Sequence, residues 1–351
     1  MKILVFGSGA LGSLYAARLE EAGHEVAILA RGQRLEDLRE YGILLENAKT
    51  GEREQQSVNV VEQFTPDDNY DLVMVVMRKN HAMAILPELG ANKKVPTFLF
   101  MMNDVAGPDE LVEALGKDRV MRGFPYPGGR REDPVVKIVP ADENRPWEIP
   151  IGEVDGSIRP RTQTVADALS DMRGFSVDIR TDMDAWLKYH FAVVGPAASA
   201  LYSVGTDQDR LAKTRDALIL CVRGIKEALH ALRKAGYEPS PKGIQVLNYV
   251  PEPLFVLLLK WFLSIESLKP SIEGHAKAAP DEMAFLMDEL LNLFQEQEIV
   301  TPVLDHLYTY YEDEVITIRE GKKKIPMRWS GVLAAGFALM LLVTLLKKPC
   351  K

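Results

Sequence analysis

The sequence predicts a doubly wound α/β domain followed by an all-α domain, and three observations support this order. A short apolar run at residues 2–6 leads into a glycine-rich turn, a helical pattern and a second apolar run at residues 25–30. Strand-like and helical stretches then alternate as far as residue 180. Beyond Thr181 the apolar residues recur almost throughout at the 3.6-residue spacing of helices.

Length, charge and cysteine usage limit the kind of protein. The 351 residues are enough for two domains with separate cores. A net charge of −8 argues against a general nucleic-acid-binding protein, so we expect no nucleic-acid partner. The two cysteines, Cys221 and Cys350, lie far apart and predict a reducing, cytoplasmic environment. The six histidines have no metal-ligand spacing, so we expect no metal site.

The first domain is expected to cover residues 1–182. Its remaining elements are expected as strands at 71–77, 95–102, 118–122 and 175–180, and as helices at about 81–90, 109–116 and 160–172. Glycine and proline are frequent between residues 123 and 160. Two short alternating runs there, at 135–139 and 147–151, predict antiparallel strands that extend the sheet.

A helical domain is expected over residues 183–325. The 3.6-residue pattern predicts helices at 183–195, 207–235, 241–250, 253–268 and 281–297. Helical second domains of this kind are compatible with a homodimer, which the sequence leaves open.

The C-terminal tail, residues 326–351, carries an uncharged apolar segment. From Trp329 to Leu346 there is no charged residue, and basic residues flank the segment on both sides. The segment is apolar all round, and its 18 residues are near the lower limit of a membrane span. It therefore predicts a single-pass membrane anchor with a cytoplasmic catalytic body. The alternative is a buried or partner-packing C-terminal helix.

The turn after the first strand has the spacing of a dinucleotide-binding motif. Six consecutive residues spell G-x-G-x-x-G: Gly7, Ser8, Gly9, Ala10, Leu11 and Gly12. The first two glycines let the backbone come close to a pyrophosphate, and the third lets the helix pack closely on the strand. The phosphates then meet backbone N–H groups at the positive end of the helix dipole. With a strand before it and a helix and strand after it, the motif predicts a Rossmann-type nucleotide-binding domain.

The residue after the second strand distinguishes between the two nicotinamide dinucleotides. An NAD site usually has an acid there, which bonds to the ribose hydroxyls and repels a 2′-phosphate. This chain reads ILARGQR, and the guanidinium of Arg31 can form a bidentate pair with a phosphate. We therefore expect NADP(H) as cofactor, with Arg31 as the main phosphate contact and Arg34 as the weaker candidate.

Several stretches, in order, resemble the ketopantoate reductase (2-dehydropantoate 2-reductase) family. They are GSGALGSLYAARL, ARGQRLEDLREYGI, VMVVMRKNHAMAILPEL, MMNDVAGPDELVEALGKDRVMRG, IPIGEVDG and TDMDAWLKYHFAVVGP. The resemblance runs from residue 1 to about residue 315. It implies that NADPH delivers hydride to the keto carbon of ketopantoate in a cleft between the two domains, and that the pantoate formed serves pantothenate biosynthesis.

The resemblance also implies roles for individual residues. Lys188 takes the place of the lysine that polarises the substrate carbonyl and supplies a proton. Asn103 matches an asparagine beside the nicotinamide and the substrate. Arg78 falls where the family often has a cofactor-contacting lysine, with Lys79 as the other candidate. Glu289 aligns with a carboxylate that anchors the substrate hydroxyl.

Some positions depart from the family pattern. Asp104 follows Asn103 where the family has glycine. Ala192 and Gly195 stand where asparagines that bind substrate are usual, and residues 275–279 do not clearly supply an expected serine. The loss of polar partners changes which substrate a site selects.

Three functions therefore stay open. The first is NADPH-dependent reduction of a 2-keto acid to a 2-hydroxy acid, with ketopantoate as the leading substrate. The second is reduction of a different keto or hydroxy acid, and the third is a non-catalytic, membrane-tethered NADP(H)-binding protein. The presence of Lys188 favours an enzyme. Asp288 remains the alternative to Glu289 as the substrate-anchoring carboxylate.

Overall fold

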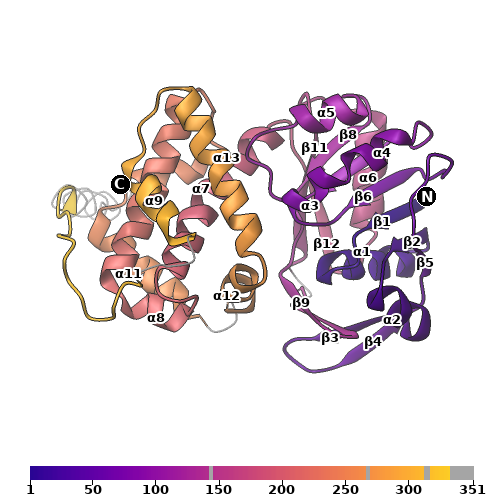
Figure 1. Cartoon of the computed structure of the whole chain (residues 1–351), viewed down its shortest axis with the longest axis horizontal. Coiled ribbons are helices and arrows are strands. Elements are labelled where there is room, and N and C mark those ends of the chain that lie inside the picture. Colours follow the sequence, from indigo (N-terminus) through magenta and orange to yellow (C-terminus); the bar gives the residue numbers. More distant parts are fainter. Residues whose placement is uncertain (142–144, 266–268, 312–316, 333–351) are drawn as a thin grey trace, which may run out of the picture. The chain divides into compact units, whose positions relative to one another are not determined.

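The computed structural model describes residues 1–141, 145–265, 269–311 and 317–332. The chain divides into two compact units, Met1–Lys188 and Tyr189–Lys351 (Figure 1). The first unit is an α/β domain and the second is helical, so the predicted fold class is confirmed. Nearly all of the predicted membrane anchor lies outside the described residues, which end at residue 332. Among the residues that are described, no single helix is both long enough and apolar enough to cross a membrane.

The first unit is built on an eight-stranded sheet. Its order is β12-β11-β8-β7-β6-β1-β2-β5, and every neighbouring pair is parallel except β11 with β8. The strands are β1 (Lys2–Phe6), β2 (Glu25–Leu29), β5 (Asn59–Val61), β6 (Leu72–Val75), β7 (Phe98–Met101), β8 (Val120–Gly123), β11 (Trp147–Glu153) and β12 (Phe175–Ile179). The chain order reverses at β1, which is where ligands bind in sheets of this kind.

Helices cover both faces of this sheet (Figure 1). They are α1 (Ala10–Glu21), α2 (Gln33–Tyr41), α3 (Lys79–Ala84), α4 (Leu86–Ala91), α5 (Asp109–Leu115) and α6 (Pro160–Ser170). Alternate residues of β1 supply the two layers: Ile3 and Val5 join the core with α1 and α6, whereas Leu4 and Phe6 join the core with α4 and α5. The helix predicted at 81–90 is two short helices, because Pro87 cannot continue the hydrogen bonds of α3.

A second sheet packs against α1. Its order is β4-β3-β10-β9. The strands are β3 (Ile43–Asn47), β4 (Arg53–Gln56), β9 (Gly129–Glu132) and β10 (Val135–Ile138). Ile43 and Val136 belong to the same core as α1. The prediction that the run at 135–139 extends the main sheet is wrong, because β10 pairs with β3 and β9. The run at 147–151 does extend it, as β11 antiparallel to β8.

The second unit is a bundle of helices around α9 (Figure 1). Its helices are α7 (Met183–Tyr202), which begins in the first unit, α8 (Gln208–Lys213), α9 (Arg215–Lys234), the 3₁₀ helix Lys242–Gln245, α10 (Val246–Tyr249), α11 (Glu252–Leu263), α12 (Lys269–Ala278), α13 (Pro280–Glu296), α14 (Pro302–Tyr308) and the 3₁₀ helix Thr309–Tyr311. The stretch predicted as one helix at 207–235 breaks at Thr214, whose backbone is extended. A Cβ on Gly224 would lie 2.5 Å from Leu307 and 3.0 Å from Pro196, so α7, α9 and α14 pack very closely there.

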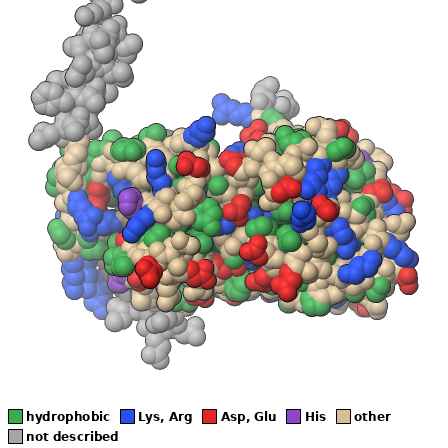
Figure 2. All heavy atoms as spheres, turned by 90° about the horizontal axis from the view of Figure 1, so that it is seen from above, with side chains coloured by type: hydrophobic (Ala, Val, Ile, Leu, Met, Phe, Trp, Pro, Cys, Tyr) green, Lys and Arg blue, Asp and Glu red, His purple; other side chains and the backbone are tan. Residues whose placement is uncertain are grey.

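On the face drawn in Figure 2, basic and acidic side chains are interspersed.

Candidate active site

The carboxyl ends of β1, β6, β7 and β8 lie at one edge of the main sheet. The glycine turn follows β1, and Lys79 opens α3 after β6. Asn103 and Asp104 follow β7, and Arg122 is the third residue of β8. Ligands of doubly wound sheets bind at this edge, beside the point where the strand order reverses. These residues therefore form the candidate site.

The glycine turn brings its backbone into close contact with α1 and with the residue after β6. Gly7 has a φ of 124°, and a Cβ on it would lie 2.4 Å from the carbonyl oxygen of Val76. A Cβ on Gly12 would lie 1.8 Å from the carbonyl oxygen of Gly7, so α1 and the turn are in close contact. Gly9 has no atom within 4 Å of an added Cβ, and α1 begins next to it with neither a side-chain cap nor an acid in its first turn. The first N–H groups of α1 therefore suit the phosphates of a dinucleotide.

Arg31 is positioned at the end of β2, but it already has an acidic partner. Its Nη2 lies 3.1 Å and 3.3 Å from the two carboxylate oxygens of Glu88 on α4. Its Nε donates to the carbonyl of Glu62 at 3.5 Å. The Arg31 side chain is 55% exposed, and exposed ion pairs contribute little to stability. A phosphate with two negative charges can therefore displace Glu88 at small cost.

Arg34 has a structural position. It is 5% exposed, and its Nη1 donates to the carbonyl of Pro134 at 3.0 Å. Its Nη2 donates to the hydroxyl of Ser13 at 3.0 Å, and that hydroxyl donates to the carbonyl of Ser8 at 3.3 Å. Arg34 thus ties α2 to the glycine turn and to the β9–β10 connection, which leaves Arg31 as the better placed phosphate contact.

A group of five charged residues, the charge cluster, occupies the edge at β7 and β8. The Nζ of Lys188 is 2.6 Å from Oδ1 of Asp184, one turn earlier on α7. The same Oδ1 accepts a hydrogen bond from Nη1 of Arg122 at 2.8 Å. The Nε of Arg122 lies 2.8 Å from Oδ2 of Asp104, and Asp104 Oδ1 pairs with Lys79. Arg122 therefore joins two acid–lysine pairs.

The charge cluster is largely shielded from solvent and contains more cations than carboxylates. The side chains of Lys79, Asp104, Arg122 and Lys188 are at most 3% exposed, while that of Asp184 is 36% exposed. Three cations face two carboxylates in the cluster. Buried cations in such a setting favour the binding of an anion, because little water screens them.

Burial and charge set the pKa values in the charge cluster. Burial lowers the pKa of Lys188 below its usual value, and Asp184 opposes this shift only in part. Burial alone would raise the pKa of Asp104 and of Asp184, but the neighbouring cations leave both pKa values below the usual range. The carboxylates therefore stay ionised, and the Lys188 ammonium releases its proton more readily than an exposed lysine does.

Asn103 offers a buried polar group at the same edge. It is 7% exposed, and its Oδ1 has no hydrogen-bond partner in the described part of the chain. An unpaired buried amide oxygen is costly, so this atom suits a donor group on a bound ligand. Gly107, in the loop after β7, lies close to the charge cluster: a Cβ there would be 3.4 Å from both Asp184 Oδ1 and Lys188 Nζ.

The remaining predicted residues lie on other elements. Arg78 is the half-buried residue before α3, and its neighbour Lys79 is the one that joins the charge cluster. Glu289 is half-buried on α13 of the second unit, next to the exposed Asp288.

Apolar packing fills the positions at which asparagines were expected. Ala192 is completely buried, and a Cβ on Gly195 would lie 2.8 Å from the ring of Phe191. This part of α7 therefore has no side-chain amide to offer a substrate.

Sequence reasoning did not single out Arg122 or Asp184. Two signals point to them: a charged residue inside the buried strand VMRG, and an acid four residues before a lysine on one helix. Asp104 shows in the sequence only as a departure from glycine, whereas the structure makes it the shared partner of Lys79 and Arg122.

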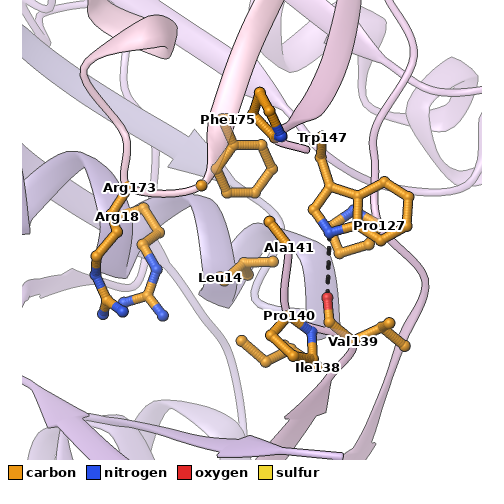
Figure 3. A pocket seen from close by; sticks show the side chains of 12 residues that line it. Leu14, Arg18, Pro127, Ile138, Val139, Pro140, Ala141, Trp147, Arg173 and Phe175 are labelled. Atoms are coloured by element: carbon orange, nitrogen blue, oxygen red, sulfur yellow. Dashed lines mark hydrogen bonds between the residues drawn. The ribbon is translucent and has the colours of Figure 1, made fainter. Parts of the chain in front are cut away.

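A cavity of 490 Å³ lies elsewhere in the first unit (Figure 3). Leu14, Trp147 and Phe175 line its apolar wall, and Arg18 and Arg173 lie together at one side. Both arginines already pair with Glu21 and Glu54. None of the predicted site residues lines this cavity.

Comparisons with known proteins agree with this geometry. Residues 3–143 match the family model described as "Ketopantoate reductase PanE/ApbA". The chain is 26% identical over 205 residues to the 2-dehydropantoate 2-reductase of Archaeoglobus fulgidus, which covers 58% of this chain and 64% of the relative. The chain thus spans less than two thirds of that relative's length.

Solved structures share the fold over nearly the whole chain. The 2-dehydropantoate 2-reductase from Geobacter metallireducens GS-15 has a TM-score of 0.72 at 18% identity, covering 90% of this chain and all of that one. D-mandelate dehydrogenase with NADH and anilino(oxo)acetate has a TM-score of 0.73 at 16% identity, covering 89% and 97% of the two chains. At such identities the likeness concerns the fold alone.

Proposed function

We propose that the chain is a ketopantoate reductase family member, as the match of residues 3–143 supports, that it reduces a 2-keto acid to the 2-hydroxy acid with NADP(H), and that 2-dehydropantoate is its substrate. The family and its curated relatives support an oxidoreductase acting on a CH–OH group. The glycine turn supports a dinucleotide, with Gly7, Gly9 and Gly12 in the required geometry.

The observation that carries the proposal is the position of Lys188 in the charge cluster. Most lysines on helices face solvent, because burial of their charge is costly. Lys188 is instead buried beside an acid and an arginine, which favours a functional role. The buried cations of the cluster suit a substrate that is itself an anion and whose keto oxygen gains negative charge in the reaction.

The hydride comes from the nicotinamide ring when NADPH is bound. Lys188 donates a hydrogen bond from Nζ to the keto oxygen and transfers a proton to it as the C=O bond becomes C–OH. Asp184 holds Nζ at 2.6 Å and keeps the ammonium in place. Asn103 Oδ1 accepts a hydrogen bond from the carboxamide of the nicotinamide or from the substrate, which satisfies its buried oxygen.

Selectivity for NADP(H) is assigned to Arg31. No acid stands at the end of β2, and Arg31 at this position can bind a 2′-phosphate once Glu88 gives way. The cation at Arg78, directly before α3, is a further cofactor contact in this proposal. Glu289 on α13 is proposed to bind the hydroxyl group of the substrate.

A second candidate is the reduction of a bulkier 2-keto acid. Ala192 and Gly195 replace amide side chains by small apolar residues, and this loss removes polar contacts that select 2-dehydropantoate. The fold shared with a D-mandelate dehydrogenase, whose solved complex contains an aryl-substituted oxoacetate, fits this candidate.

A substrate panel tests both candidates. The full chain is assayed with 2-dehydropantoate, with aliphatic 2-keto acids and with an aryl 2-keto acid, using NADPH and NADH side by side. We expect the highest kcat/KM for 2-dehydropantoate with NADPH. A higher kcat/KM for the aryl acid favours the second candidate. Cofactor binding without turnover of any keto acid supports a non-catalytic NADP(H)-binding protein.

A further inference from the structure

The outward face of α11 is apolar, which is unusual for a surface helix. Five of its large hydrophobic side chains are 43–65% exposed: Leu254, Leu257, Leu258, Trp261 and Phe262. Their spacing of three and four residues places them on one stripe of the helix. The opposite side, with Phe255, Val256 and Leu263, is buried in the second unit. The helix is therefore apolar both toward its core and toward the outside.

The short helix before α11 enlarges this stripe. Val246 and Tyr249 of α10 are 61% and 80% exposed, and the helical segment Lys242–Tyr249 is bent by 118° relative to α11. Lys226 of α9 supports the bend, because its Nζ donates to the carbonyls of Asn248, at 3.3 Å, and Val250. We call the seven exposed side chains of α10 and α11 the α10–α11 face.

The exposed charges of the segment that carries the α10–α11 face are positive. Between residues 241 and 265 the charged residues are Lys242, Glu252 and Lys260. Both lysines are exposed, whereas Glu252 is buried and pairs with Arg223 at 2.8 Å. The exposed charge of this stretch is thus positive in a protein whose net charge is −8.

The chain returns to the same place near its C-terminal end. The backbone N–H of Arg328 donates to Glu252 Oε1 at 2.8 Å, and a Cβ on Gly331 would lie 3.9 Å from Pro251. Trp329 is 67% exposed, and Arg328 is exposed beside it. A further aromatic residue and a further cation therefore lie near the start of α11.

We propose that the α10–α11 face is a membrane-binding surface that lies on an anionic lipid bilayer. Trp261, Phe262 and Leu257 enter the boundary between headgroups and acyl chains, where aromatic and aliphatic side chains are favourable. Lys260 and Arg328 meet the phosphate groups of the lipids. The α10–α11 face lies within the described residues, and membrane binding by it is independent of the proposed enzymatic function.

A second copy of the chain is the competing occupant of this face. A two-fold contact through the stripe would bring the lysine-bearing margins of two copies together without exposed acids from residues 241–265 to neutralise them. An anionic bilayer supplies the opposite charge, and it also accommodates a bent, two-helix surface without requiring complementary side chains.

Flotation with lipid vesicles tests the proposal on the full chain. We expect binding to phosphatidylcholine vesicles that contain phosphatidylglycerol, weaker binding to pure phosphatidylcholine, and further weakening by salt. The triple variant Leu257→Gln, Leu258→Gln, Trp261→Gln should bind anionic vesicles about tenfold less tightly. The matched control changes two exposed apolar residues elsewhere, Ile158→Gln and Val300→Gln, which are 61% and 81% exposed and should have no effect. If the triple variant fails to fold, Lys260→Glu serves in its place and should weaken binding to anionic vesicles alone.

Quenching of tryptophan fluorescence by brominated lipid identifies the surface that binds. The chain has four tryptophans, and the Trp261→Phe variant isolates the contribution of Trp261. Loss of most quenching in this variant supports the proposal. Vesicle binding with quenching unchanged in Trp261→Phe overturns it, because another segment then makes the contact. Absence of vesicle binding overturns it as well, and a dimer that the triple variant dissociates assigns the face to a second copy.

Discussion

Asp184 and Lys188 lie one turn apart on α7, and a single carboxylate oxygen of Asp184 contacts both the Lys188 ammonium, at 2.6 Å, and the guanidinium of Arg122, at 2.8 Å. Two cations thus share one oxygen. The arrangement orients the Lys188 side chain, because moving Nζ away would break the contact between a buried ammonium and this carboxylate.

Replacement of Lys188 should remove catalysis and spare the cofactor site. In Lys188→Ala we expect kcat with the preferred keto acid to fall about 10³-fold, since the proton donor to the keto oxygen is lost. The dissociation constant for NADPH, measured by fluorescence titration, should stay within about twofold. Retention of full activity by the alanine variant would contradict the assigned role.

Asp184→Asn should move the pH dependence of the reaction. The reduction needs protonated Lys188, so kcat/KM falls as pH rises through the pKa of this lysine. Burial lowers that pKa and the Asp184 carboxylate opposes the shift, so loss of the carboxylate lowers it further. We expect the alkaline limb of the pH–rate profile to move to lower pH. Asp209→Asn, at an exposed ion pair with Lys269, is the control and should leave the limb in place.

Asp104→Asn should destabilise the first unit. Removal of this buried carboxylate leaves Lys79 and Arg122 without their shared partner, at a cost of about 3 kcal/mol in the free energy of unfolding. The double variant Asp104→Asn, Arg122→Met should recover part of the loss in urea unfolding. The lowered pKa of Asp104 means that its stabilising effect is present above the usual carboxyl pKa and is lost as pH falls through the lowered value. An additive loss in the double variant would argue against this coupling.

Arg31 and Glu88 should have opposite effects on the choice of cofactor. Arg31→Ala should lower the affinity for NADPH about tenfold or more and leave the affinity for NADH nearly unchanged, because only NADPH has the 2′-phosphate. Glu88→Gln should raise the affinity for NADPH a few-fold, because the acid that competes for Arg31 is removed. Arg53→Ala, which breaks another exposed pair, is the control. Equal weakening of both cofactors by Arg31→Ala would mean that Arg31 does not read the phosphate.

The glycines of the turn should separate binding from folding. Gly12→Ala places a Cβ 1.8 Å from the carbonyl of Gly7, so we expect a lower melting temperature and loss of NADPH binding. Gly9→Ala has open space around the new Cβ and should keep the melting temperature while weakening NADPH, since the methyl group occupies the place of the pyrophosphate. A Gly9→Ala variant with unaltered NADPH affinity would place the phosphates elsewhere.

The sequence predicted those parts of the fold that have strong apolar patterns. β1, β2 and β7 are short buried runs, α1 lies between β1 and β2 as expected, and α6 begins and ends near the predicted residues. The second sheet was not foreseen, because β4 reads REQQ and is largely exposed, so it has no apolar signal. Pairing of β10 with β3 joins segments about ninety residues apart, and such pairing is set by tertiary packing.

Only part of the candidate site could be predicted from the sequence. A motif at one turn, such as the glycines, can be seen in a linear sequence because its function depends on local backbone geometry. The charge cluster draws on four separate segments of the chain, and nothing in the sequence says that Arg122 meets both Asp104 and Asp184. Charged residues at the ends of buried strands are the signal that can direct attention to such clusters.

The bonds of Arg34 mean that the dinucleotide motif is not self-contained. Its turn is braced, through Ser13, by an arginine on α2 that also reaches a carbonyl one hundred residues further along the chain. A graft of the first β-turn-α-β segment into a related scaffold would therefore transfer the glycine motif without the hydrogen bonds that Arg34 makes to it. Nucleotide affinity in such a chimera depends on whether the host supplies an equivalent of Pro134 at the right distance.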